Sequence, residues 1–356
     1  MSNKMRISQV MLTVGFGGAE RLFVDLCQSL AAAGHEVLAV CHPHFQRMDL
    51  LSHERVTIAH LKASWDWSPL SRYRLRKIFT AFKPQVVHTH LARGAAIAGD
   101  AATALGIPVA ANMHDYAKMK YYRSIDHFFP GTEDQRQYLI GNGIKPEMIT
   151  VVPHFTNVTP VAAVDRRPDT PPTLIAYGRL VQNKGFQVLI KSVGQLHARG
   201  IKLRLLLGGD GPEKANLQAL IRSLGLEEVV TLVGWVDNVS EFLDRGNYFI
   251  LPSLHEPFGI VILEAMARGK SIISTTVQGP VEILDQETAY LARPDDPDSM
   301  AAALAAALED RGEAERRAIN ALDKFRRCYD PSVIIPFYIQ CFEQMLTAPK
   351  AAGSRG

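Results

Sequence analysis

Segments with strand character alternate with segments of helical periodicity along nearly the whole chain, and this order restricts the fold more than any other feature of the sequence. In the first part of the chain, strands are expected at residues 6–14, 36–41, 86–90 and 108–113, and helices at 19–33 and 94–105. Strands that alternate with helices pair in parallel, because each helix carries the chain back to the start of the next strand. The sequence therefore predicts an α/β protein built on parallel sheets.

A change of composition divides this series into two. Residues 159–172, TPVAAVDRRPDTPP, are rich in proline and charge and lack periodicity, which is typical of a linker. A second series of strands follows at residues 173–177, 203–207, 229–233, 248–251 and 271–274. The 356 residues are enough for two domains of ordinary size. We expect parallel α/β domains at 1–160 and 173–330, and a final amphipathic helix at 331–347.

Composition excludes several classes of protein. The chain is 47% hydrophobic, but no apolar run is long enough to span a membrane. The first residues lead directly into a strand without a signal-peptide pattern, so a cytoplasmic protein is expected. The four cysteines are scattered and form no CxxC, which favours reduced thiols over a metal site. The net charge of +3 and the lack of a recognition module argue against nucleic-acid binding.

The stretch HEPFGIVILEAMARG, from His255 to Gly269, combines two carboxylates with a predicted helix start. Glu256 precedes a proline and is expected in a loop, whereas Glu264 lies about a turn inside the helix. The first amides of that helix have no intrahelical partner, and they belong to Phe258, Gly259 and Ile260. Carboxylates bind hydroxyl groups and free amides bind anionic oxygens, so the stretch suits a polyhydroxylated, anionic ligand.

The pattern P-S-x-H-E-P-F-G…E-A-M-A-x-G resembles the Glu-x7-Glu signature of the retaining glycosyltransferases of family 4 (GT4), which have the GT-B fold. The resemblance covers nearly the whole chain and is strongest over residues 173–292. It implies two Rossmann-like domains that face a central cleft, with the last helix crossing back to the first domain. It also implies that Glu256 lies beside the transferred sugar and that Glu264 binds the ribose of the nucleotide.

The loop GRLVQNKG after the strand at 173–177 carries Arg179 and Lys184 and opens onto a helix. Two cations beside a helix N-terminus can neutralise a departing diphosphate. The resemblance places both residues on the donor pyrophosphate, because the loop matches the G-R-L-x-x-x-K-G pattern of the family. A role in loop solubility alone is the alternative.

The first glycine-rich loop, GFGGAE, follows the first strand and only partly resembles a dinucleotide-binding fingerprint. Glu20 stands at the third glycine position, and no acidic residue ends the second strand, so NAD binding has weak support. The resemblance implies that Gly17 and Gly18 face the donor phosphates. A tight turn without a ligand is the alternative.

The ends of three further strands supply candidates by resemblance. A histidine near the reacting centre and the sugar's 6-hydroxyl is implied at His114, in ANMHD, with His90 in HTH as the competing candidate. A structural role for either histidine is also open. The turn Gly234-Trp235-Val236 is implied to receive the nucleotide base on its backbone at Val236, and packing of Trp235 in the core is the alternative.

Metal binding is not expected. Asp296-Pro297-Asp298 matches the Asp-x-Asp with which glycosyltransferases of another fold hold a divalent ion, but it lies directly before an Ala-rich helix. Asp at that position is typical of a helix N-cap. We therefore expect metal-independent transfer without a cofactor.

The first part of the chain also carries candidates for acceptor or membrane binding. Residues 62–83 combine aromatic side chains with Arg72, Arg74, Arg76 and Lys77, and a second basic aromatic cluster, KMKYYR, begins at Lys118. Such segments suit an anionic membrane surface or a lipid-linked acceptor. An ordinary helix with a charged face is the alternative, so peripheral contact through the N-terminal domain stays a hypothesis.

The residues and the resemblance together predict a retaining hexosyltransferase. The donor is expected to be a nucleotide-diphosphate sugar with UDP as the nucleotide. The expected acceptor is a hydroxyl of a cell-envelope glycan or lipid-linked molecule such as lipopolysaccharide, reached in the cytoplasm or at the inner face of the membrane. Two alternatives remain: a sugar-nucleotide epimerase, which needs no acceptor, and a non-catalytic GT-B-like binding protein.

Overall fold

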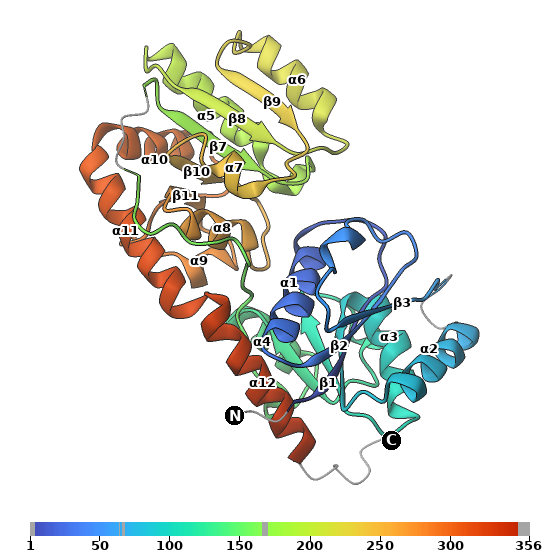
Figure 1. Ribbon diagram of the computed structural model, residues 1–356. Coiled ribbons are helices and arrows are strands. Elements are labelled where there is room, and N and C mark those ends of the chain that lie inside the picture. Colours follow the sequence, from blue (N-terminus) through green and yellow to red (C-terminus); the bar gives the residue numbers. More distant parts are fainter. Residues whose placement is uncertain (1–3, 64, 66–67, 166–169, 348–356) are drawn as a thin grey trace. The chain divides into compact units, whose positions relative to one another are not determined.

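The computed structural model describes residues 4–63, 65, 68–165 and 170–347. Residues 64, 66 and 67 of the basic aromatic stretch and 166–169 of the expected linker lie outside this part. The described chain forms two compact units (Figure 1). Unit 1 runs to His154 and is completed by the helix that begins at Pro331, and unit 2 is Phe155–Asp330. Residues 155–160, which we expected in the first domain, therefore belong with the second.

Unit 1 is a doubly wound parallel sheet in the strand order β3-β2-β1-β4-β5-β6. Its strands are β1 (Arg6–Met11), β2 (Glu36–Cys41), β3 (Val56–His60), β4 (Val86–His90), β5 (Val109–Met113) and β6 (His127–Pro130). Its helices are α1 (Gly18–Ala32), α2 (Pro69–Phe82), α3 (Leu91–Thr103), α4 (Glu133–Gly141) and α12 (Pro331–Thr347). The central strands are buried on both faces, including the polar side chains that they carry at Gln9, His88 and Asn112.

The C-terminal helix α12, red in Figure 1, packs in unit 1 with α1 among its neighbours. Its Tyr338 is fully buried, and the Tyr338 hydroxyl donates a hydrogen bond to Asn112 Oδ1 of β5 at 3.0 Å. Phe342 lies one helical turn further along, and its ring packs against those of His88 and Phe129. The expectation that the last helix returns to the first domain is thus confirmed.

Unit 2 repeats the plan with the strand order β12-β11-β10-β7-β8-β9, again all parallel. Its strands are β7 (Thr173–Tyr177), β8 (Arg204–Gly208), β9 (Val230–Gly234), β10 (Tyr248–Leu251), β11 (Ser271–Thr275) and β12 (Ala289–Ala292). Its helices are α5 (Phe186–Ala198), α6 (Lys214–Ser223), α7 (Val239–Leu243), α8 (Ile260–Ala267), α9 (Pro280–Ile283), α10 (Pro297–Glu309) and α11 (Arg311–Cys328).

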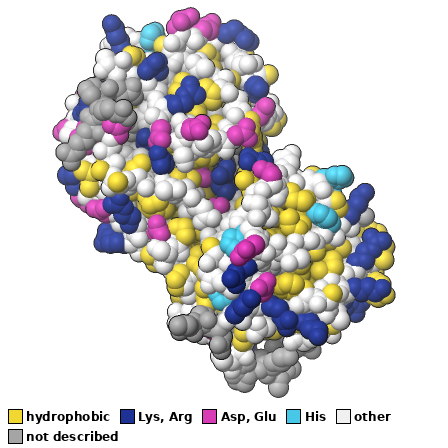
Figure 2. Space-filling model, in the orientation of Figure 1, with side chains coloured by type: hydrophobic (Ala, Val, Ile, Leu, Met, Phe, Trp, Pro, Cys, Tyr) yellow, Lys and Arg dark blue, Asp and Glu magenta, His cyan; other side chains and the backbone are white. Residues whose placement is uncertain are grey.

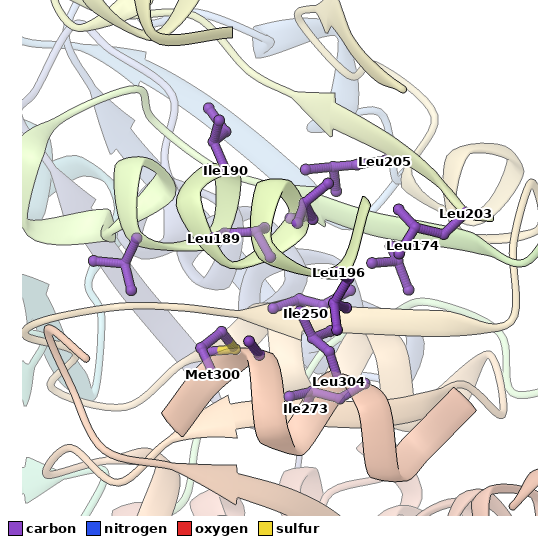
Figure 3. Close-up of a cluster of buried hydrophobic side chains, with 14 of the residues drawn as sticks. Leu174, Leu189, Ile190, Leu196, Leu203, Leu205, Ile250, Ile273, Met300 and Leu304 are labelled. Atoms are coloured by element: carbon purple, nitrogen blue, oxygen red, sulfur yellow. The ribbon is translucent and has the colours of Figure 1, made fainter. Parts of the chain in front are cut away.

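A large part of the core of unit 2 lies between its sheet and the helices α5 and α10. Figure 3 shows Leu189 and Leu196 of α5 and Met300 and Leu304 of α10 gathered with strand residues such as Ile250. All five side chains are almost completely buried. Burial of a Leu or Ile side chain contributes about 1.5–3 kcal/mol, so this layer holds the sheet rigid and positions the loops at its edges.

Each sheet has one point where the direction of winding reverses. In unit 1 this point lies between β1 and β4, and in unit 2 between β7 and β10. Ligands of open parallel sheets bind outside the carboxyl ends of the strands at such a point, because the two loops there diverge and leave a crevice. The candidate site residues should therefore be sought at these two edges. No helix in the described part of the chain has the length and apolar character needed to cross a bilayer.

Candidate active site

The carboxyl edge of the unit 2 sheet carries the loops that follow β7, β8, β9 and β10, and main-chain hydrogen bonds join these loops. Gly178 donates to the Gly208 carbonyl oxygen at 3.1 Å, and Leu180 donates to that of Asp210 at 2.9 Å. The amide of Leu254 donates to the Asn183 carbonyl oxygen at 2.8 Å, across the switch point. The loops thus hold one another in place, which preorganises any group they carry.

Lys184 and Glu256 meet across this switch point. Lys184 Nζ donates to Glu256 Oε2 at 2.6 Å, and the Ser253 hydroxyl donates to the same oxygen at 3.2 Å. Ser253 is fully buried, and the Glu256 side chain is 10% exposed. Among the described residues, none donates to Glu256 Oε1. One carboxylate oxygen is therefore fixed by the protein, and the other can accept a hydrogen bond from a ligand hydroxyl.

Arg179 lies in the same loop as Lys184 but has a different environment. Its side chain is exposed, and it makes no hydrogen bond or ion pair with any residue that the structure describes. The buried Leu180 next to it anchors the loop in the core. The Arg179 charge is therefore available to an anionic ligand at this edge, and the predicted contact with a diphosphate stays a prediction.

The N-terminus of α8 begins where the sequence predicts it. Gly259 is the N-cap, and its φ of 101° is the left-handed conformation that glycine adopts without strain. Phe258 and Ile260 on either side are buried. Gly279 donates from its amide to the Glu256 carbonyl oxygen at 2.9 Å, and its Cα lies so close to Phe258 that a Cβ would overlap the Phe258 backbone. The loop after β11 thus supports the loop that carries Glu256.

Glu264 is placed differently from Glu256. It lies on the second turn of α8, is 1% exposed, and accepts a hydrogen bond from the Tyr177 hydroxyl at the end of β7. The helix therefore brings Glu264 to the same switch point, as the eight-residue spacing from Glu256 suggested. Its contact with a ribose is not seen in the structure and stays a prediction.

The turn after β9 excludes an alternative that the sequence left open, the packing of Trp235 in the core. Trp235 is 50% exposed, so the proposal that it packs in the core is wrong. Val236 beside it is half-buried and packs where a Cβ of Gly208 would lie, which explains the glycine at that position. The backbone at Val236 is thus held close to β8, at the same edge as the other loops.

Asp296 is an N-cap, as its position before α10 predicted. Its Oδ1 accepts a hydrogen bond from the Ser299 amide at 2.9 Å, and its Oδ2 pairs with Arg293 at 2.7 Å. Asp298 accepts from the Gln195 side chain. Over the described residues, no group of three or more His, Cys, Asp or Glu side chains is arranged to hold a metal ion.

Replacement of Gly185 by Ala should disrupt the junction between the two loops. Gly185 has a φ of 66°, and a Cβ there would overlap the carbonyl oxygen of Pro252. We expect the G185A variant to lose at least about 2 kcal/mol of unfolding free energy, through left-handed strain and displacement of the loop after β10. Urea-induced unfolding measures this loss.

Gly200 provides a matched control for that variant. It also has a positive φ, 79°, but nothing lies within 4 Å of a Cβ at this position. The G200A variant should therefore show the conformational strain without the collision. If G185A and G200A destabilise the protein equally, Gly185 has no special role at the junction of the loops.

The glycine-rich loop of unit 1 follows β1, but its Gly17 amide already has a hydrogen-bond acceptor within the protein. Gly17 donates from its amide to Glu20 Oε2 at 3.0 Å, and Thr13 donates from its hydroxyl to Glu20 Oε1 at 2.8 Å. Glu20 is buried at the start of α1. A phosphate near Gly17 and Gly18 would have to compete with this carboxylate, so the structure gives the predicted donor contact no added support.

The two histidine candidates of unit 1 are hydrogen-bonded to each other. His90 Nδ1 lies 3.0 Å from His114 Nε2, and the two rings are stacked. His90 is fully buried, whereas part of the His114 side chain stays exposed. Burial lowers the pKa of His114 to about 3, so this imidazole is neutral near pH 7. Of the two histidines, His114 is therefore the one that a ligand can reach, and the buried His90 holds its ring through their hydrogen bond.

Sequence reasoning missed several residues around these groups. It did not include Ser253 and Tyr177, which hold the two glutamates, nor Gln9, His88, Asn112 and Tyr338, which surround His90. The tripeptide HTH was the only signal for the second group, because it places His88 and His90 on the same face of one strand. The remaining partners come from other strands and from α12.

Two doubly wound parallel units, each with polar side chains at its switch point, define a two-domain α/β protein of the kind that binds ligands at strand ends, and comparison with known proteins identifies the family. Residues 161–324 match the model described as glycosyl transferases group 1. Residues 16–159 match the model described as glycosyltransferase family 4. The chain belongs to the GT4-type glycosyltransferases.

Individual relatives agree with the family models. The lipopolysaccharide core biosynthesis glycosyltransferase LpsE of Rhizobium meliloti is 31% identical over 91% of this chain and 95% of its own length. A crystal structure of a glycosyltransferase from Rickettsia africae has a TM-score of 0.85 at 19% identity, covering 98% of this chain and 100% of that one. Anabaena HepE, solved with UDP and glucose, has a TM-score of 0.81 at 17% identity, covering 95% and 99%. These structures confirm the GT-B fold.

Proposed function

We propose that this glycosyltransferase moves a sugar from a nucleotide-diphosphate sugar, with UDP as the nucleotide, to a hydroxyl of a lipopolysaccharide-like or lipid-linked acceptor, with retention of configuration. One observation carries the proposal. At the switch point of unit 2, the protein fixes one oxygen of Glu256 through Lys184 and Ser253 and leaves the other to a hydroxyl-bearing ligand. Arg179 adds an uncommitted positive charge in the same loop.

The names of similar proteins favour the same substrates. LpsE is named for lipopolysaccharide core biosynthesis, and it aligns over nearly the whole of both chains. HepE was solved with UDP and glucose. A structure of the lipopolysaccharide outer core galactosyltransferase WaaB shares the fold, with a TM-score of 0.73. These likenesses support UDP as the nucleotide and a cell-envelope glycan as the acceptor.

In the proposed reaction, the acceptor hydroxyl oxygen forms a bond to the anomeric carbon as the bond from that carbon to the diphosphate breaks. The electron pair leaves with the diphosphate, and Arg179 and Lys184 stabilise the negative charge that develops there. The hydroxyl proton passes to the departing diphosphate oxygen on the same face, so the configuration is kept. Glu256 binds a sugar hydroxyl through Oε1 and is not assigned as a nucleophile.

Unit 1 has a basic hollow that suits an anionic acceptor. It measures about 250 Å³ and is lined by Arg72, Lys120, Arg123, Asp100 and neighbouring residues. Arg72 is paired with Asp100 at 2.8 Å, so that pair is neutral. Arg123 is exposed and forms no ion pair with the described residues. The Arg123 charge leaves the hollow positively charged, as the phosphate of a lipid-linked acceptor would require.

The face of α2 beside this hollow supports contact with a membrane. Leu70 and Tyr73 are at least half exposed, Trp65 just before the helix is 62% exposed, and Lys77 lies over the Tyr73 ring. Figure 2 shows Lys and Arg side chains gathered at the end of unit 1 where Figure 1 places α2. Exposed aromatic side chains among cations are typical of helices that lie on an anionic bilayer. We propose that the enzyme meets its acceptor at such a surface.

Calorimetric titration with UDP, GDP, ADP and NAD in the presence of a chelator tests the donor. We expect UDP to bind without a metal ion, and NAD not to bind, because Glu20 occupies the loop that a dinucleotide would use. Binding of NAD alone would refute the proposal. Analysis of the product then separates transfer from epimerisation, because an epimerase would release a changed sugar nucleotide without any acceptor.

Charge reversal in the basic hollow tests the acceptor. The R123E variant should raise the KM for a phosphorylated acceptor by about tenfold, since a charged contact of about 1.4 kcal/mol is lost. The kcat and the KM for the donor should stay unchanged. Lys145, an exposed cation elsewhere in unit 1, provides the control K145E. Equal effects of the two variants would show a general dependence on charge rather than a site.

A further inference from the structure

A buried hydrogen-bond network lies behind His114 in unit 1. Gln9 Oε1 of β1 lies 2.9 Å from His88 Nδ1 and 2.9 Å from His90 Nε2, both of β4. Asn112 Oδ1 of β5 lies 3.2 Å from His88 Nε2 and 3.0 Å from the Tyr338 hydroxyl of α12. His90 Nδ1 then reaches His114 Nε2 at 3.0 Å. Apart from His114, every side chain of this network is fully buried.

The protonation state of His88 restricts how this network can be arranged. Burial lowers the pKa of His88 to about 3, so the imidazole carries one proton near pH 7. A neutral imidazole donates from one nitrogen and accepts at the other. His88 nevertheless lies between two amide oxygens, those of Gln9 and Asn112. One of the two amides must therefore turn over and present its nitrogen, which occupies nearly the same position as its oxygen.

If Asn112 turns over, its nitrogen donates to His88 Nε2 and to the Tyr338 oxygen. The Tyr338 proton then has no acceptor in the network, and the buried Gln9 amide nitrogen stays unpaired. His88 and His90 both donate to Gln9. His90 Nδ1 in turn accepts from His114 Nε2, which puts the His114 proton on Nε2.

If Gln9 turns over, its nitrogen donates to both His88 and His90 and uses both of its protons. His88 then donates from Nε2 to Asn112 Oδ1, and Tyr338 donates to the same oxygen. Only the Asn112 nitrogen and the Gln9 oxygen remain without partners. An unpaired buried donor is more costly than an unpaired carbonyl oxygen, which has two lone pairs. This arrangement leaves fewer donors unpaired because it gives the Tyr338 proton an acceptor.

We infer that Gln9 presents its amide nitrogen to His88 and His90, and that the network thereby fixes His114 as the tautomer protonated at Nδ1. In this arrangement His90 Nδ1 donates to His114 Nε2. Gln9 is the positioning residue, because both of its amide protons find imidazole acceptors in this arrangement and neither has a partner in the other. A side chain of β1 thus sets the chemistry of a strand-end histidine through His90.

The consequence for the reaction rests on the proposed function. His114 Nδ1 makes no hydrogen bond with the described residues and therefore offers an N–H donor to a ligand. A neutral donor at this point suits a sugar hydroxyl or a phosphate oxygen. With the opposite tautomer, the same nitrogen would only accept, and a phosphate oxygen would find no proton there.

Histidine tautomers can be observed directly in protein labelled with ¹⁵N-histidine. Two-bond ¹H–¹⁵N correlation spectra distinguish a protonated from an unprotonated ring nitrogen, and single histidine-to-glutamine variants assign the signals. We expect Nδ1–H at His114 and His90 and Nε2–H at His88. Y338F should keep these tautomers: with Asn112 turned over, its second proton loses the Tyr338 oxygen, so this arrangement still leaves one more buried donor unpaired than the other.

The F342L variant is the control for packing. Phe342 is on the same helix and its ring packs against His88, but it makes no hydrogen bond in the network. F342L should lower stability and leave the tautomers unchanged. A His114 proton on Nε2 in the wild type would overturn the inference, as would a Y338F spectrum in which the His114 proton has moved to Nε2.

Turnover gives a second readout. Y338F should leave kcat and the KM for the donor unchanged at temperatures where it is folded, since the His114 tautomer is kept. F342L should leave kcat unchanged at temperatures where it is folded. The predicted tautomers together with a complete absence of sugar transfer would refute the proposed function and leave the network intact. Transfer activity with the opposite tautomers would refute the network alone.

Discussion

Replacement of Glu256 by Gln is expected to lower kcat by about 100-fold or more while unit 2 stays folded. The amide oxygen can still accept from Lys184 or Ser253, so the loop keeps its shape. The negative charge that Lys184 neutralises is lost, however. The atom that faces the ligand is then the amide nitrogen, which cannot accept a hydrogen bond from a sugar hydroxyl. Groups that bind the reacting centre in a preorganised site contribute effects of this size. Steady-state kinetics with a UDP-sugar and acceptor measure the change.

Two further measurements separate loss of function from loss of fold. The melting temperature of E256Q should stay within a few degrees of the wild type, because the side-chain volume is kept. Glu228, exposed before β9 at the opposite edge of the sheet, provides the control E228Q. If E256Q turned over at a rate near that of E228Q, Glu256 would have no place in the site.

Replacement of Lys184 by Met should have the second-largest effect, a fall in kcat of about 100-fold. Lys184 is expected to stabilise the departing diphosphate, and it also neutralises Glu256, whose side chain is 10% exposed. Its removal leaves a largely buried carboxylate without its cation, so K184M should also lose stability. Kinetics and urea unfolding measured on the same samples give both quantities.

A second variant separates the two roles of Lys184. In the double variant K184M/E256Q the unpaired charge is absent, so much of the stability should return while activity stays low. R179M, which removes an exposed cation without a protein partner, should lower kcat and leave stability unchanged. If the double variant were as active as E256Q alone, Lys184 would act only by neutralising Glu256.

Much of the site could be predicted because its signals are local. Glu256, Pro257 and Gly259 are close in sequence, and the geometry of a loop that enters a helix follows from their residue types. The same is true of Asp296, whose place before α10 predicted its capping bond. These positions depend on backbone preferences over a few residues, which a sequence pattern displays directly.

Predictions that depended on distant partners were less complete. The packing of Trp235 in the core was an open alternative, and the structure excludes it because the turn after β9 lies at the surface. The glycine loop suggested a phosphate site, but Glu20 turns back onto the Gly17 amide. The strands β3 and β12 at the sheet edges were not anticipated, since they have only five and four residues.

The fold class, the two-unit organisation and the family could be predicted from the sequence, because apolar periodicity, glycine positions and the motif around Glu256 lie within short segments. The partners of those residues depend on how the whole chain packs. Lys184 meets Glu256 because two loops diverge at one edge of a parallel sheet. Gln9, His88, Asn112 and Tyr338 come together from three strands and the last helix. Hydrogen bonds between distant segments depend on packing in space, and no local pattern of residues records them.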